Sequence, residues 1–554
     1  MKKKHSKPAR QERVRRIGKV LLDATQDRSR DQYSDGDIEA ELLAAVRAGR
    51  QDEMLHQDTR WPVLYHFSEE RQNLFSWLPL AGDEDVLEIG CGCGAVTGTL
   101  CRRAGHVDAV EISPRRAEIA AWRNRDFANL VIHVGNLNDL ALERKYDVIT
   151  LIGVLEYAGT FTHTADPYHD FLAQCQQYLK PSGRLIIAIE NRLGMKYWSG
   201  AHEDHTGRRF DGILDYPWGG DIRTFSRQEL SHLFAGAGFP AQQWYYPFPD
   251  YKFPFEIHSD RMLPTPKEIK NCENPTYDLD RLEIFSEQDA LASMIPAGLY
   301  SEFANSFLVV CSRAAMDAEA LPCYIHYARY RRPSDAIGTA IYERDGQRSV
   351  AKFARTPEAR AHLRAMEENG RILAELYGKE HVVASHLQSP DVLICEYAEG
   401  ESFASLCLRA IQERGLDGFL DCVNFFAAYI VRGQEQTVPT KLGIRTPGRR
   451  YDADLTFENV ILKDGNFKII DYEFLAQERC QLYAILHMLM VFRDRHEAEW
   501  KAMGLDEDMT FFQQAYQMSK ADWAAFCDDE KAFIMNLSDF LLKKYQRKRQ
   551  RGAV

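Results

Sequence analysis

The chain has 554 residues, more than one hydrophobic core usually organises, so we expect roughly two to four domains. Its composition, 45% hydrophobic and 27% charged, is typical of a globular protein, and the net charge of −12 argues against a protein that coats nucleic acid. The twelve cysteines are scattered without matched CxxC pairs, which argues against a zinc site or a disulfide framework and suits a reducing cytosol.

Residues 1–55 form a charged lead-in that we expect to be partly helical. Residues 1–16 contain eight lysines and arginines but no adjoining apolar run of the kind that a secretory signal needs. The most apolar later stretch, Leu482 to Phe492, is much shorter than the roughly 18 residues that span a bilayer. We therefore expect a cytoplasmic protein, at most peripheral to the inner face of the cell membrane.

Within residues 56–312, short β-branched runs alternate with amphipathic stretches from residue 85 to about residue 189. This alternation predicts an α/β domain with a doubly wound, Rossmann-like parallel sheet. A late strand is expected at 307–311. We interpret the aromatic segment 190–302 as an insertion that builds the acceptor side of a pocket. The other buried strands are expected at 86–89, 107–110, 131–134, 148–152 and 185–189.

A glycine-rich loop follows the first of these strands. Gly90, Gly92 and Gly94 occupy every second position before a helix that opens near residues 95–97. Glycines there allow a tight turn and close backbone approach to a ligand, and the helix N-terminus favours negative groups. A glycine loop alone is a weak signal, because many such loops are ordinary turns.

Polar residues at the ends of successive strands strengthen the signal. Glu88 stands two residues before Gly90 and can order the loop, whereas Glu111 ends the next strand, where an acid can accept both ribose hydroxyls. Gly135 and Asn136 follow the third strand, where an amide can meet an adenine edge. Glu156 follows the fourth strand, at the same edge of the sheet.

Together these residues resemble the class I methyltransferases over about residues 60–310. The E-x-G-x-G-x-G spacing resembles that family rather than the G-x-G-x-x-G of dehydrogenases. The resemblance implies S-adenosyl-L-methionine as cofactor. The fourth-strand motif lacks the Asn/Asp-Pro-Pro-Tyr of enzymes that methylate base amino groups, which disfavours an exocyclic base nitrogen as acceptor.

The insertion carries the candidate acceptor residues. His202 or His205 could be a general base, needed only if the acceptor must lose a proton. Three arginines could hold an anionic acceptor, because guanidinium groups pair with phosphate or carboxylate oxygens. A polar lid with surface salt bridges is the alternative, and the adjacent spacing of the His-Glu-Asp-His run fits zinc geometry poorly. These arginines are Arg192, Arg208 and Arg209.

After a linker at 313–323, residues 324–542 show a different pattern. Strand-like pieces over 324–353, a helix over 357–376 and a strand at 392–397 precede mostly helical sequence, which predicts a bilobal α+β domain. Asp454 and Asn459 lie five positions apart, and Asp471 follows an apolar strand. Phosphoryl transfer needs one carboxylate as catalytic group, plus an Asn and an Asp to hold Mg²⁺. Asp454 is thus the candidate catalytic residue, Asn459 a catalytic and metal-binding residue, and Asp471 a metal ligand.

Upstream residues complete the resemblance to the protein-kinase-like superfamily, on the side of its small-molecule and sugar kinases. Lys352 resembles the strand lysine that grips ATP phosphates, Glu367 (or its neighbour Glu368) its ion-pair partner, and Glu396 part of the adenine hinge. Asp452 replaces the usual His, and Asp471-Tyr472-Glu473 replaces Asp-Phe-Gly. A non-catalytic pseudokinase module therefore stays open as an alternative.

The order of the two domains resembles bifunctional enzymes that end bacterial O-antigen polysaccharides by phosphorylating a terminal sugar and methylating that phosphate. This implies a cell-surface glycan or lipid-linked saccharide as acceptor. The heptads of the coiled coil in those enzymes are missing from this sequence. The basic tail 543–554 is either a solvated helix end or a contact for an anionic membrane. Alternatives are methylation of a sugar hydroxyl or small metabolite, and, ranked lowest, methylation of RNA.

Overall fold

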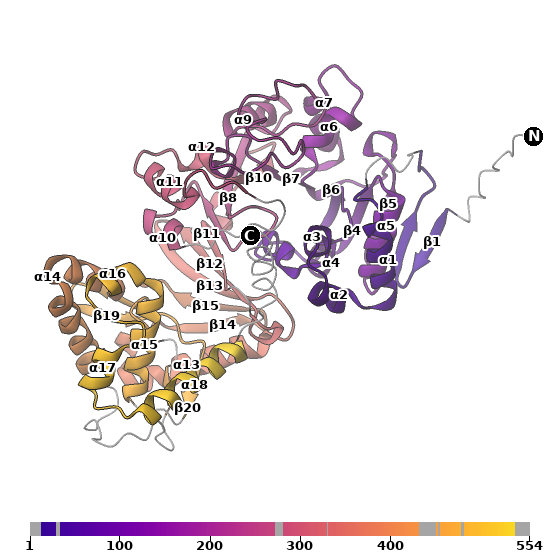
Figure 1. Ribbon diagram of the computed structural model, residues 1–554. Helices are drawn as coiled ribbons and strands as arrows, with labels where there is room; N and C mark the ends of the chain where they lie inside the picture. Colours follow the sequence, from indigo (N-terminus) through magenta and orange to yellow (C-terminus); the bar gives the residue numbers. More distant parts are fainter. Residues whose placement is uncertain are drawn as a thin grey trace, which may run out of the picture. The chain divides into compact units, whose positions relative to one another are not determined.

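The computed structural model describes residues 13–28, 34–271, 281–328, 331–430, 450–452, 455–477 and 481–537. The chain forms two compact units, and the first ends at Tyr327 (Figure 1). The sequence-based boundary, at residue 324, lies a few positions earlier. The strand that starts there, β11 (Tyr324–Tyr327), pairs with β9 (Glu256–Ser259) of the first unit.

The first unit is built on a mixed sheet with a parallel centre. Strands β2, β5, β4, β3, β6 and β7 run parallel, and β1, β10, β8, β9 and β11 extend the sheet with antiparallel pairs. The six strands expected from the sequence are confirmed as β3, β4, β5, β6, β7 and β10. In sheet order the remaining bounds are β1 (Val14–Ile17), β2 (Val20–Asp23), β5 (Leu130–Val134), β4 (His106–Glu111), β3 (Asp85–Ile89), β6 (Tyr146–Ile152), β7 (Leu179–Glu190), β10 (Ser306–Ser312) and β8 (Ala241–Phe248).

The lead-in differs from the expected charged segment, because residues 14–23 form a hairpin that joins the sheet beside β5. Val20 and Leu22 alternate with more exposed neighbours and are buried, which gives this short strand one apolar face. The insertion likewise adds β8 and β9 to the sheet. The sheet is thus wider than the sequence alone predicted.

Helices of the first unit begin at recognisable caps. The Ser113 hydroxyl accepts from the backbone of the first turn of α5, with Pro114 at its first position. Ser226 and Glu229 form a reciprocal capping box at α9. The helices are α1 (Ile38–Ala48), α2 (Gln51–Gln57), α3 (Trp61–Phe67), α4 (Thr97–Arg103), α5 (Pro114–Arg123), α6 (Ala158–Phe161), α7 (Pro167–Tyr178), α8 (Met195–Trp198), α9 (Arg227–Gly236), α10 (Pro266–Asn271), α11 (Glu287–Met294) and α12 (Tyr300–Phe303).

The second unit begins with the antiparallel strands β12 (Ile337–Arg344), β13 (Gln347–Ala354), β15 (Val392–Glu396) and β14 (Ser385–Ser389). Leu363 and Met366 of α13 (Arg360–Tyr377) pack into one core with Ile337 and Leu393 of these strands. A helical part follows, as the sequence predicts. Its elements are β16 (Glu401–Ser402), β17 (Arg450–Asp452), β18 (Val460–Lys463), β19 (Asn466–Ile469), β20 (Leu475–Gln477), α14 (Phe403–Phe425), α15 (Gln481–Arg495), α16 (Glu497–Ala502), α17 (Thr510–Ala515) and α18 (Lys520–Leu537).

Within the described residues, none of the helices has both the length and the apolar character that crossing a membrane requires. The basic tail at 543–554, a candidate membrane contact in the sequence, lies outside the described residues.

Candidate active site

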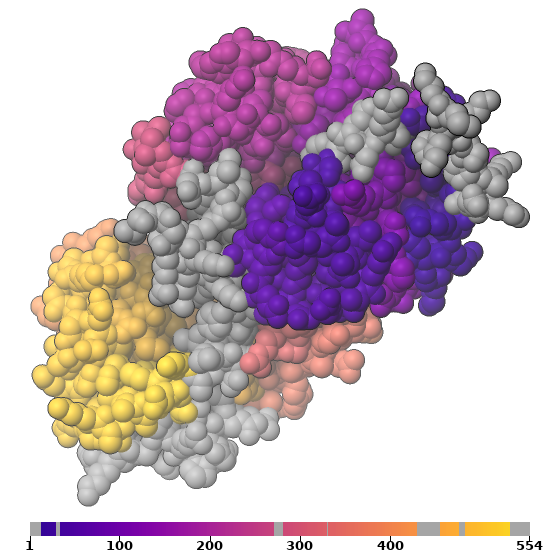
Figure 2. All heavy atoms as spheres, turned by 45° about the vertical axis from the view of Figure 1, so that its right-hand side comes forward, coloured from indigo at the N-terminus to yellow at the C-terminus, as the bar shows by residue number. Residues whose placement is uncertain are grey.

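A cavity of about 360 Å³ lies at the carboxyl ends of the parallel strands, where ligands of open α/β sheets bind. The residues that follow β3, β4, β5, β6 and β7 line it. Helix α3 adds Trp61, Tyr65 and His66 to the wall. The segment that carries α1, α2 and α3 contributes to the indigo surface near the centre of Figure 2.

The glycine loop forms one side of this cavity. Gly90 has a φ of +73°, and a Cβ there would approach Cγ2 of Val154 to 2.5 Å, so a larger residue does not fit. Gly92 has a φ of +55°, and a Cβ there would meet no atom of the described residues within 4 Å, because this position faces the open cavity. Gly94 also has a positive φ and lies at the start of the turn into α4. The three predicted glycines are thus all in conformations that favour glycine.

Glu111 and Glu88 are both buried beside the loop. The Glu111 carboxylate accepts hydrogen bonds from the backbone N–H groups of Gly92 and Ser113, each at 2.8 Å, which fixes it against the loop. Burial raises the pKa of Glu111 despite these hydrogen bonds. Burial also raises the pKa of Glu88, to about 7, and its Oε2 atom accepts no hydrogen bond from any described residue. Both side chains line the cavity, as the sequence predicted.

Gly135 and Asn136 line the cavity as well, but the Asn136 side chain is engaged locally. Its Oδ1 accepts from the backbone N–H of Asn138 at 3.0 Å, and its Nδ2 donates to the carbonyl of Phe161 at 2.9 Å. The amide therefore caps the short turn Leu137–Asp139, which differs from the expected contact of this side chain with adenine.

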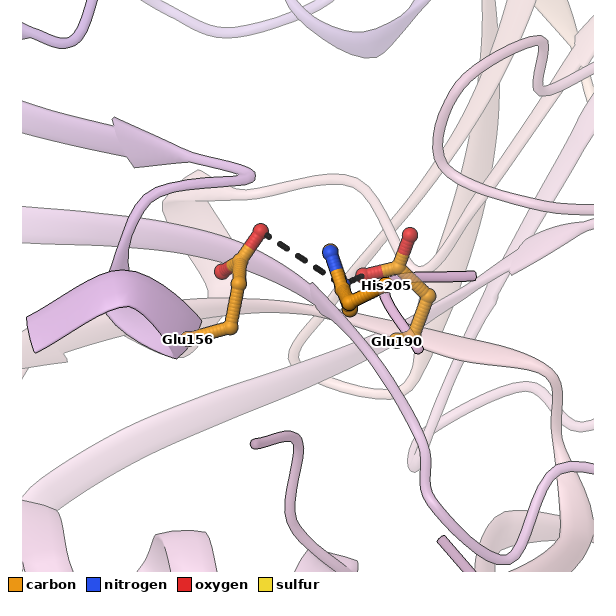
Figure 3. Close-up of side chains that lie close together, drawn as sticks. All are labelled: Glu156, Glu190 and His205. Carbon is orange, nitrogen blue, oxygen red and sulfur yellow. Dashed lines mark ion pairs between the residues drawn. The ribbon is translucent and has the colours of Figure 1, made fainter. Parts of the chain in front are cut away.

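Glu156, Glu190 and His205 also line the cavity and lie close together (Figure 3). His205 Nε2 lies 3.5 Å from Glu190 Oε2 and 4.0 Å from Glu156 Oε1. His205 Nδ1 lies 3.1 Å from the Tyr157 hydroxyl. Burial raises the pKa of Glu156 to about 8. Burial lowers the pKa of His205, but the carboxylates of Glu190 and Glu156 outweigh it and raise that pKa to about 9.

Two lysines and two aspartates surround this cluster. Lys252 contacts Glu190 directly and lies 3.0 Å from Asp204, and against the effect of burial it holds the pKa of Glu190 well below its ordinary value. Lys196 pairs with Asp204 at 2.9 Å and with Asp250 at 2.7 Å. The charges around Glu190 and His205 are therefore linked in one network of ion pairs.

The three arginines predicted to hold an acceptor lie outside the cavity lining. Arg192 donates to both oxygens of Glu229, at 2.7 and 3.2 Å, so its guanidinium is engaged by the capping box of α9. Arg208 is exposed and lies over the Trp218 ring, 5.4 Å from its centroid. Arg209 donates to a backbone carbonyl at 3.2 Å. The structure does not bring these three side chains together, which corrects the expected acceptor site.

Of the two histidines considered as a base, only His205 lines the cavity. His202 forms an isolated backbone bridge with Arg209 and lies outside the lining. Sequence reasoning missed Glu190 and Lys252. Glu190 ends β7 and could have been found by the same strand-end argument that selected Glu156. Lys252 lies in the insertion, where the sequence pattern gave no signal for it.

In the second unit, Lys352 of β13 is buried and lies 2.8 Å from Asp471 and 3.6 Å from Glu473. Glu473 also lies 3.3 Å from Nε2 of His362. Glu367 accepts from the backbone N–H of Leu387 at 2.8 Å instead of pairing with Lys352. The acidic partners of Lys352 thus come from the segment after β19, which corrects the expected pairing with α13.

The other predicted residues of this unit are more dispersed. The carbonyl of Asn459 accepts from the N–H of Ile470 at 3.0 Å, which places Asn459 beside the segment that contains Asp471. Glu396 of β15 pairs with Lys468 of β19, a strand of a different sheet, and its side chain is 46% exposed. Asp454, the predicted catalytic residue, lies outside the described residues.

Comparisons with known proteins find similarity to methyltransferases. A family profile described as "Methyltransferase domain" matches residues 87–185. Demethylmenaquinone methyltransferase of Tropheryma whipplei (strain Twist) is 30% identical over 132 residues, which cover 24% of this chain and 48% of that protein. Ubiquinone biosynthesis O-methyltransferase of Xanthomonas euvesicatoria pv. vesicatoria (strain 85-10) is 30% identical over 190 residues, which cover 28% of this chain and 76% of that protein.

Among solved structures, the N-methyltransferase NodS from Bradyrhizobium japonicum WM9, in complex with S-adenosyl-L-homocysteine, is 20% identical with a TM-score of 0.21. The match covers 26% of this chain and 72% of that one. The chain spans about half the length of the first curated relative that it matches.

Proposed function

The chain belongs to the S-adenosylmethionine-dependent methyltransferases, and we propose that its first unit transfers the methyl group of this cofactor to an acceptor held in the cavity. The observation that carries this proposal is the pairing of Gly92 with Glu111 at the cavity wall. At this place the backbone of Gly92 is open to a ligand. The carboxylate of Glu111, at the end of the second strand of the motif, is held in position beside it.

The described residues fit the cofactor. The Glu88 carboxylate has an unpaired buried oxygen within the described structure, and each Glu111 oxygen accepts one backbone hydrogen bond, which leaves capacity for ribose hydroxyls. Acidic side chains from four strand ends line the cavity and suit the positive charges of the amino group and sulfonium. When bound, the cofactor supplies an electrophilic methyl group. The carboxylates are Glu88, Glu111, Glu156 and Glu190.

The acceptor would lie between the glycine loop and the Glu156–Glu190–His205 cluster. A hydroxyl acceptor must lose a proton as it is methylated, and this cluster presents buried oxygen and nitrogen atoms at that place. Tyr157 holds the imidazole of His205 from the other side. This supports a hydroxyl-type acceptor more than a phosphate held by arginines, because the predicted arginines pair elsewhere.

Calorimetry with S-adenosylhomocysteine tests the cofactor proposal on the purified full chain. We expect saturable binding to one site, weakened about 10–100-fold by Glu111→Gln, since a hydrogen bond to a charged group contributes about 1.5–3 kcal/mol. Glu118→Gln is the matched control, because Glu118 lies on α5 outside the lining and pairs with Arg47. A folded wild-type chain without affinity for this compound refutes the proposal.

For the second unit we propose a phosphotransferase that phosphorylates a bacterial surface glycan or its lipid-linked precursor, near the cytoplasmic face of the membrane, before the first unit methylates a hydroxyl of the phosphorylated product. The pairing of the buried Lys352 with Asp471 supports it, because phosphoryl transfer needs a lysine for the phosphates and an acid for Mg²⁺. The alternative is a pseudokinase that binds without catalysis, beside a methyltransferase of a sugar hydroxyl or small metabolite.

Incubation of a glycan acceptor with ATP and then with labelled cofactor separates these possibilities. The sequential proposal expects methyl incorporation that requires ATP and is lost in Asp471→Ala. Incorporation that is indifferent to both refutes it. Thermal stabilisation by Mg²⁺ and ATP, without phosphorylation of the acceptor, identifies a non-catalytic module.

A further inference from the structure

Glu156, Glu190 and His205 bring two carboxylates and one imidazole together from three separate segments. Glu156 lies in the short turn Leu155–Tyr157 after β6, Glu190 ends β7, and His205 lies in a turn of the insertion. One ligand atom from each lies within 4.8 Å of the others (Figure 3). We propose that these three side chains bind a divalent transition-metal ion of the Zn²⁺ or Mn²⁺ class at the acceptor end of the cavity.

The donor atoms are buried and lack other partners where a metal would need them. Glu156 is 1% exposed, and neither of its oxygens accepts a hydrogen bond from a described residue. Glu190 Oε2 and His205 Nε2 likewise form no hydrogen bond within the described structure, although they face each other at 3.5 Å. Buried polar atoms are almost always satisfied in folded proteins, so unpaired atoms from three residues around one point indicate a binding site for a ligand.

The spacing is close to that of a coordinated ion. Metal–ligand distances of about 2.0–2.2 Å in a tetrahedral site place neighbouring donor atoms about 3.4 Å apart. The distances from His205 Nε2 are 3.5 Å to Glu190 and 4.0 Å to Glu156, near that value, and one donor atom from each of the three residues lies within 4.8 Å of the others. One imidazole with two carboxylates suits Zn²⁺ or Mn²⁺ better than Mg²⁺ or Ca²⁺, which prefer oxygen ligands alone.

The charges of the surrounding network also call for a divalent cation. Four carboxylates and two lysines are linked by ion pairs, directly or through His205, so with a neutral imidazole their formal charge is −2. The buried Glu203 carboxylate beside them, which accepts from the backbone of His205, adds to the negative charge. A divalent ion offsets this charge, and the competing occupants are protons. The members are Glu156, Glu190, Asp204, Asp250, Lys196 and Lys252.

An outer shell orients the proposed ligands. With its proton on Nδ1, His205 donates to the Tyr157 oxygen and presents the Nε2 lone pair to the carboxylates. Lys252 holds the other oxygen of Glu190, so that Oε2 points toward His205. The Glu203 carboxylate accepts from the backbone N–H of His205 at 2.9 Å and fixes that turn. Metal-binding histidines and carboxylates are usually supported in this way.

Three protein ligands leave an open position toward the cavity, as in catalytic zinc sites. A catalytic role for the bound ion rests on the proposed methyltransferase function. A hydroxyl of the acceptor bound at that position would have a lowered pKa and would lose its proton to solvent before it attacks the methyl group.

The experiment uses the full chain without a polyhistidine tag, stripped of metal by a chelator and titrated with Zn²⁺ by calorimetry and with Mn²⁺ by electron paramagnetic resonance. We expect one site per chain. Glu156→Gln and His205→Gln should each weaken Zn²⁺ binding by at least about 100-fold, beyond the 10–100-fold expected for the outer-shell variant Tyr157→Phe.

Two matched variants serve as controls for metal affinity. Glu88→Gln removes another buried carboxylate of the same cavity, and His202→Gln removes the neighbouring histidine outside the lining. Both should leave Zn²⁺ binding unchanged. Affinity for S-adenosylhomocysteine, measured in His205→Gln and His202→Gln, shows whether the cavity is folded and keeps a failure of the metal proposal separate from a failure of the cofactor proposal. The inference is overturned if the wild-type chain has no stoichiometric metal site, or if the site survives both ligand substitutions. In that case protons, and not a metal ion, neutralise the charge of the cluster.

Discussion

The ionisation of Glu88 makes the stability of the first unit depend on pH in a way that one substitution removes. Glu88 is 2% exposed, and burial raises its pKa from 4.5 to about 7. When folding raises the pKa of a carboxyl group, the protein has its full unfolding free energy at pH values below the ordinary pKa. That contribution is lost as the pH rises through the pKa of the folded state. Glu88→Gln keeps the shape of the side chain without the charge.

The magnitude follows from the size of that rise. At about 1.4 kcal/mol for each pH unit, ionised Glu88 costs the folded state about 3 kcal/mol. Between pH 5 and pH 8 the wild-type unit should therefore lose about 2–3 kcal/mol of unfolding free energy that Glu88→Gln retains. The other titrating groups contribute alike to both proteins, so the difference between them isolates this carboxyl.

Urea unfolding of cofactor-free protein at pH 5 and pH 8 measures this difference, with the transition of the first unit assigned as the one that S-adenosylhomocysteine shifts. Glu118→Gln is the control. Against the effect of burial, Arg47 and Arg15 hold the pKa of Glu118 below its ordinary value, so its titration lies below pH 5 and its substitution should act equally at both pH values. If the unfolding free energy of Glu88→Gln changes between pH 5 and pH 8 by the same amount as that of the wild type, then Glu88 is not buried in its ionised form and the reasoning fails.

Two further substitutions test packing in each unit. Gly90→Ala should lower the unfolding free energy of the first unit by about 2–5 kcal/mol, because it combines a positive φ with a Cβ 2.5 Å from Val154, and unchanged stability in urea would contradict this backbone conformation. Glu530→Ala should lower that of the second unit by about 3–5 kcal/mol, because the buried Glu530 carboxylate lies 2.8 Å from Nδ1 of His487. Asp528 is exposed, so the unfolding free energy of Asp528→Ala, measured in the same urea titration, should stay within about 0.5 kcal/mol of the wild type. Equal effects of the two substitutions would show that the buried pair does not stabilise the second unit.

Much of the first unit could be predicted because its signals are local. Each buried parallel strand is a short β-branched run, and the residues that end neighbouring strands must meet at one edge of the sheet. Glu88, Glu111 and Glu156 were found by this argument, and all three line the cavity. The hairpin at 14–23 was missed, because four-residue strands carry too little alternation to be separated from a charged loop.

The sequence by itself determined the parallel sheet, the glycine loop and the carboxylates at the strand ends, because backbone conformation and strand direction act over a few residues. Only the tertiary structure decided that His205 and Lys252 reach the cavity while Arg192 does not. Arg192 meets Glu229 across 37 residues, and Lys252 meets Glu190 across 62. Such pairings depend on how the insertion folds back onto the sheet, since a buried charge takes whichever partner the packing brings to it.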